Sequence, residues 1–333
     1  MDKYILYSFY QHDIEKRGVN WMKRLKKIVI KALSFSNISI KKVYKIYRKV
    51  LNMVNPYFKP MYNLWDHKIM VGGREIPVRI FQPEENRTSK VLIFFHGGGW
   101  VTGNINSYTK VCANMANQTR RTVISVDYRL APEHPFPAGL EDCYQVTREI
   151  YLKLDLMNCT AEDITLIGDS AGGNLAAVVS LMARDCGEFL PGKQVLIYPS
   201  TYNDHSESSP FLSVQENGTD YILTSKRVQD YMELYVQNED DRDCPYFAPL
   251  LAKDLSDQPE TLIITAEYDP LRDEGEEYGK RLKEFGNHVE TYRMKDALHG
   301  FFSSPWTSEY VIKCYNIING FLSHQKDCNE EQA

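Results

Sequence analysis

The chain has 333 residues, of which 43% are hydrophobic and 25% are charged, proportions typical of a globular protein rather than a disordered or fibrous one. A net charge of −5 and an isoelectric point near 6.0 give no reason to expect nucleic acid as a partner. The length predicts either one large core with added segments or two domains.

Several features predict a cytoplasmic protein. The longest dense apolar runs, residues 91–95 and 262–264, are far shorter than the ~20 residues of a membrane-spanning helix, so we expect no stable insertion into a membrane. The apolar opening stretch 4–10 is followed by Gln11, His12 and Asp13 instead of a signal-peptide cleavage site. The seven cysteines are scattered and contain no C-x-x-C pair, which is typical of reduced thiols and not of a disulfide framework or a zinc site.

The first part of the chain is strongly basic. Residues 16–65 contain 13 Lys and Arg and no Asp or Glu. Within this stretch apolar residues recur at helical spacing, which predicts two amphipathic helices: Trp21, Leu25, Ile28, Val29, Ala32 and Leu33, then Val43, Ile46, Tyr47, Val50 and Val54. Their cationic outer faces fit either a membrane-surface element or helices packed on the acidic remainder of the protein, and we favour the second interpretation.

From residue 67 onward the pattern predicts an α/β fold. Residues 68–71 and 75–81 flank Gly72 and Gly73, as in a β-hairpin with a tight turn. Short apolar strands then alternate with helices, which predicts a mainly parallel sheet covered on both faces. The expected strands are 91–95, 122–127, 164–168, 195–198, 261–266 and 289–293, and the expected helices lie near 107–119, 139–153, 172–186, 271–285 and 307–323. Residues 203–244 interrupt this alternation as an insertion with an amphipathic segment at 224–236.

Residues 168–172 read Gly-Asp-Ser-Ala-Gly, a G-x-S-x-G sequence between a predicted strand and a predicted helix. Such a sharp strand-to-helix turn strains the serine and exposes its Oγ, which predicts Ser170 as a nucleophile. The start of the helix also favours negative charge beside it. The alternative is a tight glycine turn with a serine that only caps the helix.

Residues 96–100, His-Gly-Gly-Gly-Trp, follow the strand at 91–95. Three consecutive glycines have a conformational cost that bare backbone N–H groups aimed at a ligand oxygen would explain. A tetrahedral intermediate of acyl transfer carries such an oxyanion. A phosphate cradle is the rival use, but neither the P-loop nor the dinucleotide-binding arrangement of glycines is present.

A serine nucleophile needs a base and an orienting carboxylate. His299 follows the last predicted strand and precedes Gly300, while Asp269 follows the strand at 261–266. Asp273 and Glu267 are nearby rivals for the acid. The order Ser170, Asp269, His299 is that of an α/β-hydrolase.

With these residues the chain resembles the hormone-sensitive lipase family of α/β-hydrolases, the bacterial family IV esterases. The matching segments are 96–100 (HGGGW), 128–138 (YRLAPEHPFPA), 168–175 (GDSAGGNL), 269–275 (DPLRDEG) and 299–301 (HGF). The resemblance implies an α/β-hydrolase core at 63–202 and 245–333. It also implies a mostly helical cap made of the N-terminal segment 1–62 and the insertion 203–244.

The same resemblance implies roles for individual residues. Ser170 would be the nucleophile, Asp269 the orienting acid and His299 the base, with no metal or organic cofactor. The oxyanion hole would come from backbone N–H groups of Gly98, Gly99 and Ala171, with Gly97 as a further candidate. Apolar residues beside the motifs are candidates for a substrate pocket: Trp100, Tyr198, Tyr202, Phe211, Leu212, Leu271 and Phe301.

These roles predict a serine carboxylesterase that hydrolyses a small-molecule ester with a short- to medium-length chain. Two alternatives stay open at this stage. One is a non-catalytic small-molecule receptor on the same scaffold, as in the plant gibberellin receptor, and the other is an amidase or deacetylase of the same family. The sequence also leaves open whether the protein is a monomer or a homodimer.

Overall fold

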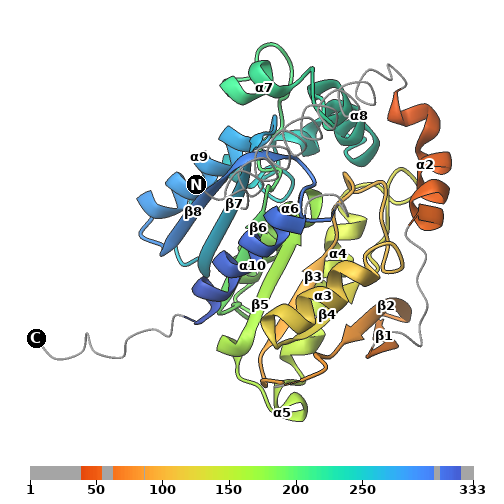
Figure 1. The fold of residues 1–333 in the computed structure, drawn as a ribbon, viewed down its shortest axis with the longest axis vertical. Helices are drawn as coiled ribbons and strands as arrows, with labels where there is room; N and C mark the ends of the chain where they lie inside the picture. Colours follow the sequence, from red (N-terminus) through yellow and green to blue (C-terminus); the bar gives the residue numbers. More distant parts are fainter. Residues whose placement is uncertain (1–38, 55–62, 86, 304–307, 324–333) are drawn as a thin grey trace, which may run out of the picture.

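Eight strands form one twisted sheet in the part of the chain that the computed structural model describes, residues 39–54, 63–85, 87–303 and 308–323 (Figure 1). The spatial order is β1-β2-β4-β3-β5-β6-β7-β8. β1 and β2 form an antiparallel hairpin, β2 runs antiparallel to β4, and the remaining pairs are parallel. The strands are β1 Leu64–Val71, β2 Arg74–Phe81, β3 Val91–Phe95, β4 Thr122–Val126, β5 Ile164–Asp169, β6 Lys193–Ile197, β7 Glu260–Tyr268 and β8 Val289–Leu298.

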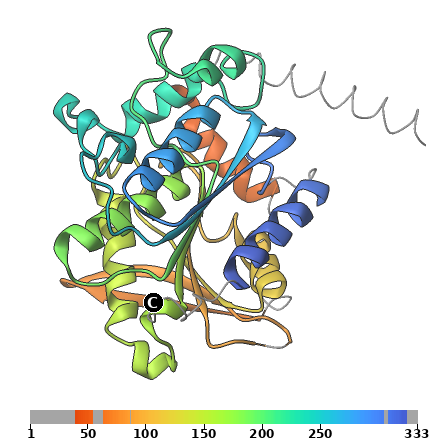
Figure 2. The same cartoon turned by 90° about the vertical axis from the view of Figure 1, so that its left-hand side faces the viewer.

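Helices cover both faces of the sheet (Figure 2). One face carries α3 (Thr109–Thr119) and α10 (Ser308–Ser323), and the other carries α4 (Ala138–Tyr151), α6 (Ala171–Cys186) and α9 (Arg272–Glu284). Side chains alternate along a strand, so the fully buried β3 supplies both layers. Its Leu92 and Phe94 pack on the α3 and α10 side, and Ile93 and Phe95 pack on the α6 side.

The predicted fold class is confirmed, and the largest error concerns the end of the last strand. The sequence predicts a strand at 289–293, but β8 continues to Leu298. It does so because Leu298 still pairs with Tyr268 beyond a register shift, in which three residues of β8 stand opposite one residue of β7. The polar residues Lys295 and Asp296 break the apolar pattern and hide this extension from sequence reasoning.

Three further helices lie above the end of the sheet to which the parallel strands point (Figure 1). They are α2 (Ile40–Val54), α7 (Leu212–Asn217) and α8 (Ser225–Tyr235). The side chain of Thr224 accepts a hydrogen bond from the Arg227 N–H, which explains why α8 begins where it does. The six-residue α7 has no clear sequence signal. Further short elements are α5 (Leu154–Met157), η2 (Ala161–Asp163), η3 (Glu239–Asp243) and η4 (Pro249–Leu251).

The inner face of α2 packs on α8, and the two helices are joined by charge. Asp230 accepts the backbone N–H of Ile40 at 3.2 Å, and Lys41 forms an ion pair with Glu233. Arg48 forms an ion pair with Glu133 at 3.0 Å. These contacts favour the interpretation that the second basic helix packs on the acidic body.

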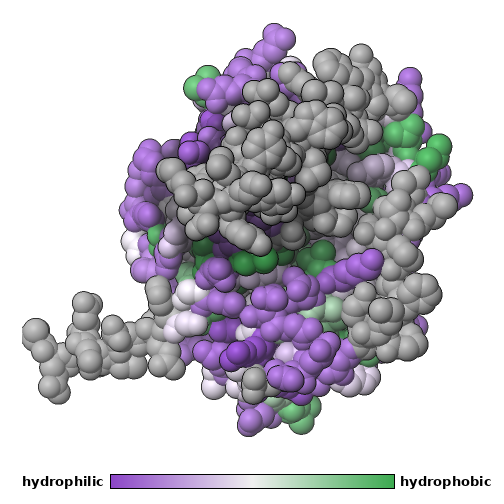
Figure 3. Space-filling model, viewed as in Figure 1, coloured by the Kyte–Doolittle hydropathy of each residue, from purple (hydrophilic) through white to green (hydrophobic). Residues whose placement is uncertain are grey.

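The outer face of α2 is exposed and partly hydrophobic (Figure 3). Ile46 on this helix is 64% exposed. The first predicted basic helix, at 21–33, lies outside the described residues, and the cap and core boundaries stay a prediction. Over the described ranges, no helix combines the length and apolar character needed to cross a bilayer.

Candidate active site

Ser170 occupies the turn between β5 and α6 with a strained backbone. Its φ and ψ are 57° and −120°, and its N–H donates to Ile197 O at 2.8 Å. The turn is tight because α6 passes close to the neighbouring strand: a Cβ on Gly172 would lie 1.9 Å from Phe95 O. Only glycine fits at that position, and the strained serine presents its side chain at the surface of the turn.

His299 lies between Ser170 and Asp269. Its Nε2 is 2.9 Å from Ser170 Oγ and its Nδ1 is 2.7 Å from Asp269 Oδ2. Asp269 is fully buried, and its other oxygen, Oδ1, accepts the Leu271 N–H at 2.9 Å. With one oxygen fixed by backbone, the second is aimed at the imidazole. Three residues from three separate loops therefore form one hydrogen-bonded relay.

The two rival carboxylates have other partners. Asp273 accepts the Ser213 N–H at 2.7 Å and forms an ion pair with Arg272 at 2.7 Å. Glu267 accepts the Asp296 N–H at 2.6 Å. Both carboxylates therefore have structural partners, and the geometry assigns the relay to Asp269.

We call residues 96–100 the oxyanion loop. The structure corrects one prediction about this loop. The Gly97 N–H donates to Asp169 Oδ1 at 2.8 Å, so it is not available to an oxyanion. A Cβ on Gly97 would lie 2.8 Å from Asp169 Oδ2, which explains the glycine by close packing instead. The expectation that Gly97 serves as a donor is therefore wrong.

Gly98 and Gly99 keep their N–H groups as candidates. Gly97 O is 2.8 Å from His96 Nδ1, and Gly98 O accepts the Thr102 N–H at 2.9 Å. In a trans peptide the carbonyl and the following N–H point in opposite directions. The Gly98 N–H therefore points away from His96, and the Gly99 N–H points away from Thr102. Neither of these N–H groups is directed at the partner of the preceding carbonyl.

His96 holds this loop as a neutral imidazole. Burial lowers the pKa of His96 below the ordinary histidine value. Since Gly97 O can only accept, Nδ1 must carry the ring proton and donate it. The ring of Tyr128 stacks on His96 at 4.3 Å, and its hydroxyl donates to His96 O at 2.6 Å.

Ala171 supplies the first N–H of α6. The first four N–H groups of a helix have no partner within the helix, and together with the helix dipole they favour an anion. Ala171 follows Ser170 directly, so this donor lies beside the reacting hydroxyl.

Most of the predicted pocket residues have other roles. Trp100 is buried and stacks on Tyr235 at 4.7 Å, and Phe301 packs on Tyr198 at 5.1 Å. The Tyr198 ring packs against the ring of His299, with the two ring centroids 4.7 Å apart. Packing therefore accounts for these three side chains, and the expectation that they line an open pocket is wrong.

The other four predicted pocket residues divide into three groups. Leu271 is 2% exposed and acts through its N–H on Asp269. Tyr202 and Phe211 are half-buried and pack edge to face at 5.2 Å. Leu212 is 61% exposed. The pair Tyr202 and Phe211 keeps the surface that a substrate could contact.

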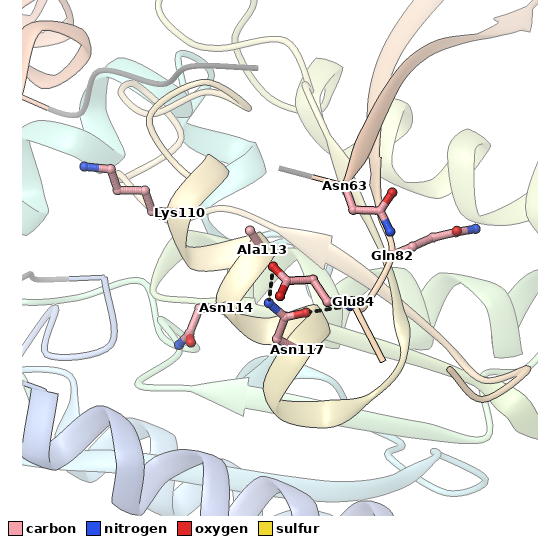
Figure 4. A pocket seen from close by; sticks show the side chains of 7 residues that line it. All are labelled: Asn63, Gln82, Glu84, Lys110, Ala113, Asn114 and Asn117. Carbon is pink, nitrogen blue, oxygen red and sulfur yellow. Dashed lines mark hydrogen bonds between the residues drawn. The ribbon is translucent and has the colours of Figure 1, made fainter. Parts of the chain in front are cut away.

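Two hollows of about 250 and 260 Å³ lie elsewhere on the molecule. The first is lined mostly by amide side chains between β2 and α3, and Figure 4 shows Asn117 bonded to Glu84 within it. The second is bordered by Arg120, Arg121 and the end of α10. Neither hollow contains a residue of the relay, so the proposed chemistry does not use them.

Asp169 is the main residue of this site that the sequence reasoning missed. It stands inside the quoted Gly-Asp-Ser-Ala-Gly sequence, but its type alone predicts no contact. The carboxylate is buried and accepts from Gly97, from Tyr108 Oη at 3.1 Å and from Tyr198 Oη at 3.4 Å.

Within the described residues, no group of three or more His, Cys, Asp or Glu side chains is arranged to hold a metal.

A parallel sheet with a strained serine after β5, and a histidine and an aspartate after the following strands, defines an α/β-hydrolase site. A family model described as alpha/beta hydrolase fold matches residues 92–303. The chain belongs to this family.

Relatives and solved structures agree with this assignment. An arylesterase of Saccharolobus solfataricus is 38% identical over 247 residues, which cover 74% of this chain and 79% of that protein. The carboxylesterase NlhH of Mycobacterium tuberculosis is 37% identical over 234 residues, 69% of this chain and 72% of that protein. A Pyrobaculum calidifontis esterase structure has a TM-score of 0.79 at 35% identity and covers 88% of this chain and 97% of its own.

Proposed function

We propose that the protein is a serine carboxylesterase that hydrolyses short- to medium-chain carboxylic esters through an acyl-enzyme on Ser170. The observation that carries this proposal is the relay from Ser170 through His299 to Asp269, with contacts of 2.9 and 2.7 Å. The relatives named arylesterase and carboxylesterase support ester hydrolysis as the reaction.

The mechanism has two acyl-transfer steps. His299 Nε2 takes the proton of Ser170 as Oγ attacks the ester carbonyl, and the resulting oxyanion accepts hydrogen bonds from the N–H groups of Gly98, Gly99 and Ala171. His299 then protonates the leaving alcohol. Water repeats the sequence on the acyl-enzyme and releases the acid. Asp269 stays ionised, keeps the Nδ1 proton in place and stabilises the imidazolium.

The alternatives predict different behaviour. A non-catalytic receptor does not need a complete relay, so the relay argues against this hypothesis. An amidase or deacetylase would use the same relay. A matched pair of p-nitrophenyl ester and p-nitroanilide substrates with the same acyl group therefore separates esterase from amidase.

The chain length of the acyl group tests the proposal directly. We expect native protein to hydrolyse p-nitrophenyl esters with a kcat/KM maximum between about C2 and C8, because the half-buried Tyr202 and Phe211 offer a limited apolar surface. Initial rates from C2 to C16 measure this preference. A folded protein without turnover at any length would overturn the proposal and favour a receptor, whereas a maximum at C16 would indicate a lipase.

The activity should depend on pH, because the proposed general base, His299, must be neutral to act. We expect kcat/KM to fall between about pH 8 and pH 5, because only neutral imidazole can take the Ser170 proton. The sign follows from the role: protonation of His299 lowers activity. Initial rates in buffers of constant ionic strength measure the profile, and a flat profile over this range would contradict the assignment of His299.

We further propose a cytoplasmic location, which the six cysteines of the described residues support because all of them are free thiols. The proposed mechanism uses a small-molecule ester as substrate and involves no nucleic acid and no cofactor. All three relay residues come from one chain, so the mechanism operates equally in a monomer and in a homodimer. Light scattering on the purified protein distinguishes these two states.

A further inference from the structure

Asp169 is a buried carboxylate that none of the mechanistic steps above uses. It is 2% exposed, and no described lysine or arginine forms an ion pair with it. Burial of a carboxylate without a cation is unfavourable unless hydrogen bonds compensate for the lost water. Three donors converge on it instead: the Gly97 N–H on Oδ1, and Tyr108 Oη and Tyr198 Oη on Oδ2.

Two of these donors, Gly97 and Tyr198, connect Asp169 to different segments of the proposed active site. Gly97 lies in the oxyanion loop, directly before the two candidate oxyanion donors. Tyr198 Oη in turn accepts the N–H of Phe302 at 3.3 Å, and Phe302 lies three residues after His299. Asp169 itself precedes Ser170. One carboxylate therefore connects the segments that carry the nucleophile, the oxyanion donors and the base.

Burial raises the pKa of Asp169 to about 6, while hydrogen bonds from Tyr108 and Gly97 and the nearby His299 act in the opposite direction. Deprotonated Asp169 thus has a charge that a protonated His299 would stabilise, and the reverse also holds. The negative charge of deprotonated Asp169 would therefore stabilise the His299 imidazolium that forms as Ser170 attacks.

We propose that Asp169 is a positioning residue, whose carboxylate fixes the oxyanion loop through Gly97 and the His299 segment through Tyr198. The inference rests on the proposed esterase function. Asp169 does not touch the ester. Its effect is to keep the oxyanion donors and the base in register with Ser170, where a misplacement of about 1 Å costs on the order of 100-fold in rate.

The test compares Asp169→Asn with native protein on p-nitrophenyl acetate. The amide can still accept from Gly97, but its NH₂ group faces the two tyrosine hydroxyls that donate to Oδ2. We expect kcat to fall about 10- to 100-fold, because the oxyanion donors and His299 are displaced from Ser170. KM should change less than about 3-fold, because the residues that contact the substrate are unchanged. Tyr198→Phe, which removes one hydroxyl, should lower kcat about 3- to 10-fold.

Two matched variants control for a merely structural effect. Asp142→Asn changes another buried aspartate, which forms ion pairs with Arg74 and Arg129 away from the relay. Tyr278→Phe removes a buried hydroxyl on α9. Both should keep native kcat, even if Asp142→Asn lowers the thermal midpoint.

A pH profile gives a readout that packing would not change. Protonation of Asp169 removes the same charge as Asp169→Asn, so on acidification through about pH 6 the native log(kcat/KM) should fall more steeply than that of the variant, which lacks this titrating group. Burial raises the pKa values of the surrounding tyrosines and of Cys112, away from this pH range, and lowers the pKa of His96. The groups are Tyr108, Tyr128, Tyr198, Tyr315, Cys112 and His96.

The outcomes separate the inference from the function on which it rests. An inactive native protein overturns the esterase proposal itself. An active native protein with Asp169→Asn within 2-fold of its kcat, or with Asp142→Asn equally impaired, overturns the positioning role. If Asp169→Asn does not fold, an unchanged kcat in Tyr198→Phe overturns it as well.

Discussion

Ser170→Ala should lower kcat for p-nitrophenyl esters by about 10⁴- to 10⁶-fold, since without Oγ no acyl-enzyme can form. The residual rate would come from the oxyanion donors and from binding alone. The variant should fold, because alanine removes only one oxygen and the neighbouring glycines that permit the turn are unchanged. Steady-state kinetics with circular dichroism as a check on folding measure both expectations.

A second serine on the same helix is the control for this substitution. Ser180 is buried in α6, where its hydroxyl bonds to Ala176 O at 3.1 Å, far along the helix from the relay. Ser180→Ala should keep native kcat. A fluorophosphonate probe should label native protein and Ser180→Ala but not Ser170→Ala, as seen by intact-protein mass spectrometry. More than about 1% residual activity in Ser170→Ala would contradict its role as the nucleophile.

Asp269→Asn should lower kcat by about 10⁴-fold while leaving the fold intact. The reason lies in the second oxygen of Asp269. Because the Leu271 N–H needs an acceptor at Oδ1, the amide oxygen must stay there and the NH₂ group must face His299 Nδ1. The imidazole then carries its proton on Nε2 and cannot accept one from Ser170.

Asp273→Asn is the matched comparison, because Asp273 is close in sequence and bonds to Arg272 and Ser213 instead. We expect kcat within about 3-fold of native for this variant and a modest loss of thermal stability. The pair of variants measured under identical conditions decides between the two carboxylates. A large loss in Asp273→Asn with an active Asp269→Asn would reverse the assignment of the acid.

The three relay residues were within reach of sequence reasoning because each follows a strand that the pattern predicts. Ser170 follows β5, Asp269 follows β7 and His299 follows β8. Parallel strands carry their carboxyl ends to the same edge of a sheet, so residues far apart in the chain meet there. The choice among Asp269, Asp273 and Glu267 was not accessible from the motif alone, since it depends on which carboxylate the local turn directs at the imidazole.

The pocket and the oxyanion loop show where local reasoning stops. Gly97, Gly98 and Gly99 are the same residue type, yet the N–H of Gly97 donates to Asp169, a side chain 72 positions away. Gly98 and Gly99 stay the proposed oxyanion donors. Trp100 and Phe301 are apolar beside a motif, and only the packing of Tyr235 and Tyr198 against them shows that they are core.

The sequence by itself predicted the α/β class and, through its motifs and their resemblance to the hydrolase family, Ser170, Asp269 and His299 as the relay residues. The α/β class follows from hydrophobic periodicity, which acts over a few neighbouring residues. Only the tertiary structure shows that the Gly97 N–H donates to Asp169, that the Asp269 carboxylate contacts His299, and that Tyr198 connects Asp169 to Phe302. These depend on contacts between residues 29 to 104 positions apart, where distance and direction, not residue type, determine the chemistry.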